Sequence, residues 1–322
     1  MNQERKKLGF ELLLNNLWKN LGWMMLTNLL FAIPFIGAIA IAYVLCLYVL
    51  PVVPVTLPVA VILASPFYAG VVSLSREFSQ GIKPDNMFKK YFSAVKENGL
   101  RFLLGGFLLY LAYLICYFSV TIYSSLASLS WIFYILLFVV IVICIFFLFM
   151  FYAVPLMTVS FDLKLKDIYK NSALMTFGEI KQNFFATIGV AAYLAVVLMP
   201  IMIISYMSSI LPVATVKILL IAYGAIALGV LIPAPCAMII SNYLYPNMRS
   251  VIAGEDISEN NSSAPAPDIR PRGESYNEDV SSEPEVDIDE LRKGDGEEYI
   301  FYQGKMIKRK ILIERLEETN ND

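Results

Sequence analysis

Residues 83–104 read KPDNMFKKYFSAVKENGLRFLL and join a lysine-rich amphipathic segment directly to a long apolar run. Pro84 and Asp85 predict a helix start, because proline fixes φ and a carboxylate caps free backbone amides. Asn98 and Gly99 are expected to interrupt that helix before the apolar run begins. The predicted apolar face, at 100° per residue, consists of Met87, Phe88, Tyr91, Phe92, Ala94 and Val95.

This amphipathic segment predicts a helix that lies on the inner membrane surface and leads into a spanning helix. The alternative is a helix of soluble type that caps the inner ends of a helix bundle. Lysines occupy the predicted polar face, among them Lys89, Lys90 and Lys96. Either way, the segment indicates a membrane protein.

Composition separates the chain into two chemically different parts. It is 58% hydrophobic, with a mean hydropathy of +0.64. Residues 1–249 hold 16 Lys/Arg against 8 Asp/Glu, a charge of +8, and residues 250–322 hold 9 against 19, a charge of −10. We therefore expect a membrane domain at 1–249, a disordered acidic linker at 250–296 and a short ordered segment at 297–322.

Six apolar runs are long enough to cross a bilayer as helices, since about 20 residues span its hydrocarbon core. The predicted fold is all-α and multi-pass, with six transmembrane helices arranged as three hairpins. The predicted spans are Leu21–Leu50, Val59–Ser75, Phe102–Tyr123, Trp131–Ser160, Phe184–Met207 and Val213–Tyr243.

The placement of basic residues predicts the orientation. Fifteen Lys/Arg lie before the first span, in the loops 76–101 and 162–183, or after the last span, whereas only Lys217 lies on the opposite side. Because basic residues concentrate on the cytoplasmic side, we expect both termini to be cytoplasmic in the cell membrane.

The three hairpins also share a pattern that predicts a structural repeat. Each begins with an amphipathic stretch (residues 5–20, 84–98 and 164–182) and has a lysine shortly before an asparagine, and each second helix carries a proline. The asparagines and prolines are Asn20, Asn98, Asn183, Pro66, Pro155 and Pro235. Coincidence of common residues is the alternative explanation.

Four segments resemble the YesL family of bacterial multi-pass membrane proteins, a family of unknown function. They are TNLLFAIPFIG (27–37), ASPFYAGVVSLSREFSQG (64–81), FKKYFSAVKENGLRF (88–102) and FYAVPLMTVSFDLKLKDIYKNSALM (151–175). The chain departs from the family pattern by extra residues between Ile36 and Ala64. Members are often encoded beside carbohydrate-uptake and glycan-degradation genes, so the resemblance implies an accessory role in sugar use and supplies no catalytic site.

Few polar residues lie inside the predicted spans. Asn28 is expected to form an interhelical hydrogen bond, with a substrate contact as the alternative. Lys217 is expected to extend to the outer surface, with an anionic ligand as the alternative. The absence of Asp, Glu and Arg from the spans argues against a proton-coupled pump.

The charged residues outside the spans predict contacts with lipid rather than catalysis. Lys89, Lys90, Lys96, Lys170 and Lys181 are expected to lie near anionic lipid headgroups at the cytoplasmic face. Carboxylates such as Glu77 and Asp162 are interpreted as solvated partners of these lysines. The chain has no histidine, and its four cysteines lie separately in apolar runs, so no catalytic residue, metal, cofactor or nucleic acid is expected.

The C-terminal region predicts two further features. The acidic segment 255–298 offers an opposite charge to the basic loops, over which it is expected to lie. Residues 299–302 and 305–307 flank Gln303 and Gly304, which favours a tight hairpin, and a short helix follows. Because a lone hairpin is marginally stable, we expect it to dock on another surface, with a frayed end as the alternative.

We therefore expect a non-catalytic accessory, scaffold or regulatory membrane protein linked to carbohydrate uptake, acting with a membrane transporter complex. A transporter or channel for an uncharged or amphiphilic solute is the main alternative. A lipid-handling enzyme is a third possibility, but the sequence offers no residues for its chemistry.

Overall fold

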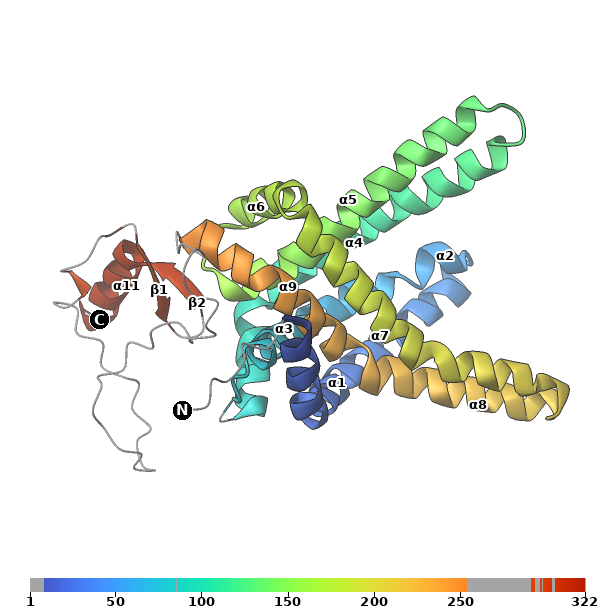
Figure 1. The fold of residues 1–322 in the computed structure, drawn as a ribbon, viewed down its shortest axis with the longest axis horizontal. Coiled ribbons are helices and arrows are strands. Elements are labelled where there is room, and N and C mark those ends of the chain that lie inside the picture. The colour runs from blue at the N-terminus through green and yellow to red at the C-terminus, as the bar shows by residue number, and fades with distance from the viewer. Residues whose placement is uncertain are drawn as a thin grey trace.

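The described part of the chain consists of long helices and one small β-hairpin (Figure 1). The computed structural model describes residues 9–84, 86–253, 291–292, 296, 298–302 and 305–321. In chain order the elements are α1 (Gly9–Tyr48), α2 (Val53–Thr56), α3 (Val59–Ser79), α4 (Met87–Leu126), α5 (Ile132–Ser160), α6 (Leu165–Gly178), α7 (Ile180–Tyr206), η1 (Met207–Ser209), α8 (Val213–Ile226), η2 (Ala227–Leu231), α9 (Pro233–Ala253), β1 (Tyr299–Tyr302), β2 (Lys305–Lys308) and α11 (Arg309–Asn321).

Six helical segments among the described residues are long and apolar enough to cross a membrane, which confirms the predicted helical class and agrees with a multi-pass arrangement. They are Leu13–Tyr48, Val53–Ser79, Met87–Leu126, Ile132–Ser160, Ile180–Ser209 and Val213–Leu231. Several extend well beyond the predicted spans, because the flanking amphipathic residues continue the same helices.

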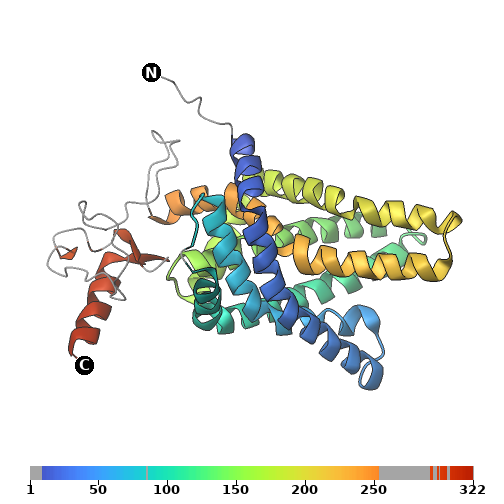
Figure 2. The same cartoon turned by 90° about the horizontal axis from the view of Figure 1, so that it is seen from below.

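The spans are arranged as hairpins that diverge from a common base (Figures 1 and 2). The α4–α5 and α7–α8 hairpins separate toward their turns, and α2 joins α1 to α3 on the same side of the molecule. The opposite side carries the end of α3, the beginning of α4, α6 and the end of α9. We call this side the basic end, because it holds the lysine-rich segments 83–101 and 164–181.

Helix α3 forms the centre of the base. Every residue from Ala69 to Ser79 is buried, and α3 packs against α1, α4 and α9. Small residues permit this close packing: a Cβ atom added to Gly70 would lie 2.4 Å from the ring of Tyr91, and one added to Gly106 would lie 2.4 Å from the hydroxyl of Ser65. The core therefore lies near the basic end.

The outer halves of the diverging hairpins are exposed on nearly all faces. Tyr206, for example, is 79% exposed, and Trp131, Ile210 and Ile221 are similarly exposed. Large apolar side chains in this position are those expected to face lipid in a membrane-spanning helix.

Helix α4 corrects the prediction of an interruption at Asn98 and Gly99, because it runs unbroken from Met87 to Leu126. The side-chain amide of Asn98 donates to Ala94 O at 3.1 Å, so it bonds within the helix instead of ending it. The cap is Asn86, whose side chain accepts from the backbone N–H of Lys89 at 3.0 Å. Asp85 lies outside the described residues.

The three amphipathic stretches also differ from prediction. Only the third forms a separate helix, α6, because α1 and α4 each continue directly into a span. The predicted apolar face of α4 is divided: Met87, Tyr91 and Ala94 are buried in the bundle, whereas Phe88 and Phe92 are exposed. The basic residues before Leu8 lie outside the described part of the chain.

The last predicted span is broken. Residues 213–243 were expected to form one helix, but α8 passes into the π-helical turn η2, and α9 begins afresh at Pro233. Proline has no N–H and cannot continue the α-helical hydrogen-bond pattern, so the break occurs at this residue.

The predicted C-terminal hairpin and helix are present. Strands β1 and β2 pair antiparallel, with Tyr302 opposite Lys305, and α11 follows. Leu291, Ile300, Ile307 and Leu312 form a small apolar cluster within this C-terminal module (residues 291–317). The turn residues 303–304 and most of the acidic linker lie outside the described residues.

Candidate functional site

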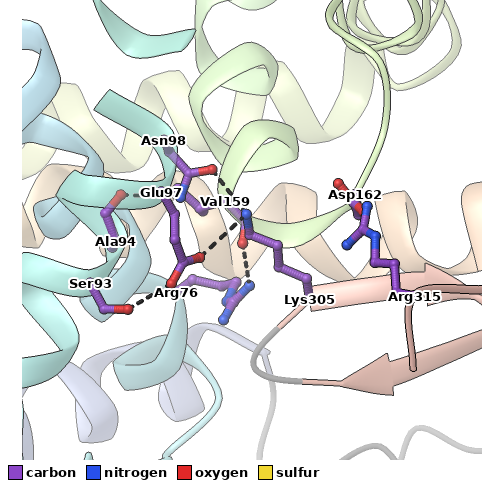
Figure 3. A network of polar contacts seen from close by, with 9 residues as sticks. All are labelled: Arg76, Ser93, Ala94, Glu97, Asn98, Val159, Asp162, Lys305 and Arg315. Atoms are coloured by element: carbon purple, nitrogen blue, oxygen red, sulfur yellow. Dashed lines mark hydrogen bonds and ion pairs between the residues drawn. The ribbon is translucent and has the colours of Figure 1, made fainter. Parts of the chain in front are cut away.

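The C-terminal hairpin docks on the basic end, where Lys305 approaches α4 and Arg315 approaches Asp162 in the chain between α5 and α6 (Figure 3). Met306 of β2 forms a parallel bridge with Phe161, and the backbone N–H of Asp162 donates to Met306 O at 3.0 Å. Phe161 adopts an extended conformation after the end of α5, which leaves its neighbour's N–H available. The side chain of Met306 is 2% exposed and packs in the apolar core of the bundle.

Lys305 extends from the hairpin to α4. Its ammonium donates to Asn98 Oδ1 at 3.1 Å and lies 3.5 Å from a carboxylate oxygen of Glu97. The bundle fixes both acceptors, because Ser93 donates to Glu97 at 2.6 Å and Asn98 bonds to Ala94. We call the surface formed by Glu97, Asn98, Phe161 and Asp162 the strand seat.

A second cation of the module completes the contact, since Arg315 of α11 forms an ion pair with Asp162. The module thus docks through its cations on bundle carboxylates. The opposite arrangement, an acidic segment over basic loops, was predicted for residues that mostly lie outside the described part of the chain. Asp162 is paired with the chain's own C-terminal helix, so it is not a solvated partner of the loop lysines.

Beneath the seat lies a buried ionic cluster that the sequence interpretation missed. Arg76 is 2% exposed and Glu77 is 3% exposed, although both were taken as ordinary loop charges. Glu77 forms an ion pair with Lys90 and lies 3.5 Å from Arg76. Its predicted role as a solvated carboxylate is therefore wrong. Burial follows from the position of α3, which other helices surround.

Arg76 connects α3 to the end of α5. It donates to Val159 O at 3.0 Å, a carbonyl in the last turn of α5, where no further helical N–H is available. Its guanidinium also lies 5.8 Å from the ring centre of Tyr245 on α9. Arg76 therefore fixes the point at which the chain leaves α5 and enters the strand seat.

A few buried polar atoms at this end have no hydrogen-bond partner among the described residues, including Arg76 Nε, Glu77 Oε2 and the Tyr169 hydroxyl. Burial raises the pKa of Tyr169 because it disfavours the phenolate. Unpartnered buried groups reduce stability, so this region is not optimised for stability alone.

Asn28 lies at the break in the last span. Its side-chain N–H₂ donates to Val230 O at 2.7 Å, and its Oδ1 accepts from the backbone N–H of Ala234 at 2.7 Å. These two backbone groups would pair with each other in an unbroken α-helix. The amide of Asn28 therefore bridges the broken helix, and the interhelical hydrogen bond expected at this residue is present twice.

Other helices satisfy the remaining polar groups near the break. Tyr193 of α7 donates to Leu231 O at 2.8 Å, and Ser75 of α3 donates to Ala234 O at 3.0 Å. Side chains from α1, α3 and α7 thus bond to four backbone groups at the break: Val230 O, Leu231 O, and the N–H and C=O of Ala234.

The predicted lysines are placed on separate helices. Lys89, Lys96, Lys170 and Lys181 are exposed at the basic end, whereas Lys90 is engaged with buried Glu77. Figure 1 shows α6 and the beginning of α4 apart, so the lysines form no single cluster. Lys217 is exposed near the beginning of α8, close to the turn that joins α7 to α8.

The site has the features that bind an extended peptide. Among the described residues, no group of three or more Cys, Asp or Glu side chains could hold a metal ion. Backbone groups, a buried apolar position and an acceptor for ammonium together recognise an extended peptide. The sequence offered one signal for the buried pair: small residues on every face of α3, typical of a helix packed on all sides.

No family model, curated protein or solved structure matches the chain.

Proposed function

We propose that this chain is a non-catalytic accessory or scaffold protein of the cell membrane, of YesL type, with both termini in the cytoplasm. Its partner is a membrane transporter complex, and the resemblance to YesL proteins links it to carbohydrate uptake or use. The observation that carries the proposal is a contrast. Asn28, the polar residue at the intramembrane break, uses both ends of its amide on the chain's own backbone, whereas the basic end has a seat on which a β-strand of the C-terminal hairpin docks.

Lipid contact at the cytoplasmic face is part of the proposal. Lys89, Lys96, Lys170 and Lys181 are exposed beside the exposed aromatic rings of α4, α6 and α7. Cations beside apolar groups suit the headgroup region of anionic lipids, where each exposed cation contributes about 1 kcal/mol.

The threefold hairpin repeat supports the same architecture. Asn20, Asn98 and Asn183 are all buried, and the side-chain amide of each donates to a backbone carbonyl four or eight residues earlier. A repeated structural unit would retain a buried asparagine of this kind, hydrogen-bonded to the backbone, at the base of each hairpin.

Co-purification from native membranes in mild detergent tests the accessory role. A stoichiometric membrane partner is expected, and a chain that elutes alone from its native membrane would contradict it. The topology is tested in a cysteine-free background with an impermeant thiol reagent: cysteines at positions 125 and 209 should react from outside intact cells, and one at position 93 should not.

The broken last span favours transport of an uncharged solute as the second candidate. Discontinuous helices near the membrane midplane commonly form solute sites in transporters. Saturable flux of an uncharged sugar into proteoliposomes that hold the folded chain, and no flux into empty liposomes, would establish that function. Absence of flux alongside a co-purifying partner would leave the accessory role as the sole candidate.

A further inference from the structure

The strand seat is held in shape by the bundle and does not depend on the hairpin. Asn98 is oriented by Ala94, Glu97 by Ser93, and the end of α5 by Arg76. All these contacts lie within α3, α4 and α5 (Figure 3). The polar side chains of the seat therefore have partners within the bundle that remain when the hairpin leaves.

The C-terminal module is likewise held together by its own contacts. Its small apolar cluster joins both strands to α11, and ion pairs Arg309–Glu298 and Arg292–Glu317 lie within it. The module can therefore move as a unit.

Among the described residues, the contacts between the two parts include the hydrogen bond from the Asp162 N–H to Met306 O, the buried Met306 side chain with Tyr299 packed against the same core, and the cations Lys305 and Arg315 on bundle carboxylates. Glu97 is 48% exposed, and salt screens ion pairs of this kind. Salt should therefore weaken this part of the module's hold on the bundle.

We propose that the C-terminal module is an exchangeable occupant of the strand seat, and that the same seat docks the partner membrane protein once the module is released. This inference rests on the proposed accessory function and adds its regulation. The partner chemistry follows from the seat: an extended strand whose backbone pairs with Phe161–Asp162, carrying a lysine for Asn98 and Glu97 followed by an unbranched apolar residue at the position of Met306.

Tethering explains why the module keeps the seat closed. The module and the bundle belong to one chain, since α9 precedes β1 in the sequence, so the module competes with any external strand as an intramolecular ligand. The apparent affinity for an external strand is therefore its intrinsic affinity multiplied by the fraction of time that the seat is open. Weakening the module's hold should raise the affinity for an external strand.

A labelled peptide of residues 298–317 tests the proposal on the full chain in lipid nanodiscs. The full chain with Lys305→Glu should bind the peptide at least about tenfold more tightly than the wild type. The substitution removes the module's ammonium from Asn98 and Glu97, so the seat is open for a larger fraction of the time. Lys310→Glu is the matched control: it reverses the charge of an exposed lysine on the same module, and it should bind like the wild type. Adding Asn98→Leu to Lys305→Glu should abolish the gain.

Hydrogen exchange of segment 160–164 provides a second measurement. Exchange should become faster in Lys305→Glu and remain unchanged in Lys310→Glu, because the amide of Asp162 loses its acceptor only when the module leaves. Equal peptide affinity in all variants, binding that survives Asn98→Leu, or unchanged exchange would each overturn the proposal.

Partner capture separates this inference from the function on which it rests. A partner that co-purifies more strongly with Lys305→Glu than with the wild type supports the exchange. A partner that co-purifies equally with both refutes the exchange and leaves the accessory function standing. If no partner is recovered from either, the accessory function fails, whatever the peptide result.

Discussion

Replacing Asn28 by leucine should destabilise the protein more than the loss of one interhelical hydrogen bond would. Such a bond in a membrane contributes around 1 kcal/mol or less. Here the amide serves two backbone groups, Val230 C=O and Ala234 N–H, and both would remain unpaired in an apolar interior. At about 1–2 kcal/mol for each unpaired group, Asn28→Leu should lower the free energy of unfolding by about 2–4 kcal/mol.

The assay is reversible unfolding by SDS in mixed micelles, followed by tryptophan fluorescence. Trp23 lies one turn before Thr27 on α1 and so reports on the same region. Thr158→Val is the matched control: this buried hydroxyl donates at 2.7 Å to Val154 O in its own helix, so its removal leaves no helical group unpaired. The control should lose no more than about 0.5 kcal/mol.

A loss below about 1 kcal/mol for Asn28→Leu would refute this reasoning. The break would then be held by Tyr193 and Ser75 alone, or the two ends would pair with each other in a rewound helix. Faster hydrogen exchange at Ala234 distinguishes a persistent break from a rewound one, since rewinding restores a partner for that N–H.

Three further predictions concern the base of the bundle. Glu77→Gln should lower the free energy of unfolding by about 3 kcal/mol, because it leaves buried Arg76 without the carboxylate beside it. Glu97→Gln, at a half-exposed site, is the control and should cost less than about 1 kcal/mol. Unfolding by SDS measures both losses. Gly70→Ala should lower the free energy of unfolding by about 1–3 kcal/mol, and with it the melting temperature, because the added methyl group clashes with the ring of Tyr91. Gly22→Ala is the control and should be neutral or stabilising, because Gly22 has open space around it. Tyr169→Phe should stay within about 1 kcal/mol of the wild type at neutral pH. Burial raises the folded-state pKa of this tyrosine above its usual value of about 10. The contribution of Tyr169 to the free energy of unfolding is therefore complete below about pH 10 and is lost as pH rises through the folded-state pKa. The stability of the wild type should accordingly decline more steeply above about pH 10 than that of Tyr169→Phe.

The six spans were predictable because uncharged apolar runs of this length have few alternatives. The continuity of α4 was not, because Asn98 and Gly99 usually weaken helices. Asn98 is satisfied within its own helix, and an added Cβ at Gly99 would lie 3.6 Å from Pro66, which is an ordinary contact distance. Packing of α4 against α3 and α5 supports a helix that the local propensity of these two residues does not favour.

The candidate site was less predictable, because its contacts join distant parts of the sequence. Asn28 was identified as a polar intramembrane residue, but its partners lie more than 200 positions away and depend on a break that was expected to be a continuous helix. Lys305 reaches Asn98 over a similar separation. The sequence around Asn28, Asn98 and Lys305 contains no local pattern that indicates these pairings.

The unbroken course of α4 has a mechanical consequence. Helix α4 contains no proline along its 40 residues, so it lacks the residue at which helices most often bend. From Asn98 at the strand seat to Leu126 at the far turn, the helix extends about 42 Å at 1.5 Å per residue. It can therefore act as a stiff lever: a tilt of about 5° at the seat displaces the opposite end by about 4 Å, so an event at one membrane surface becomes detectable at the other.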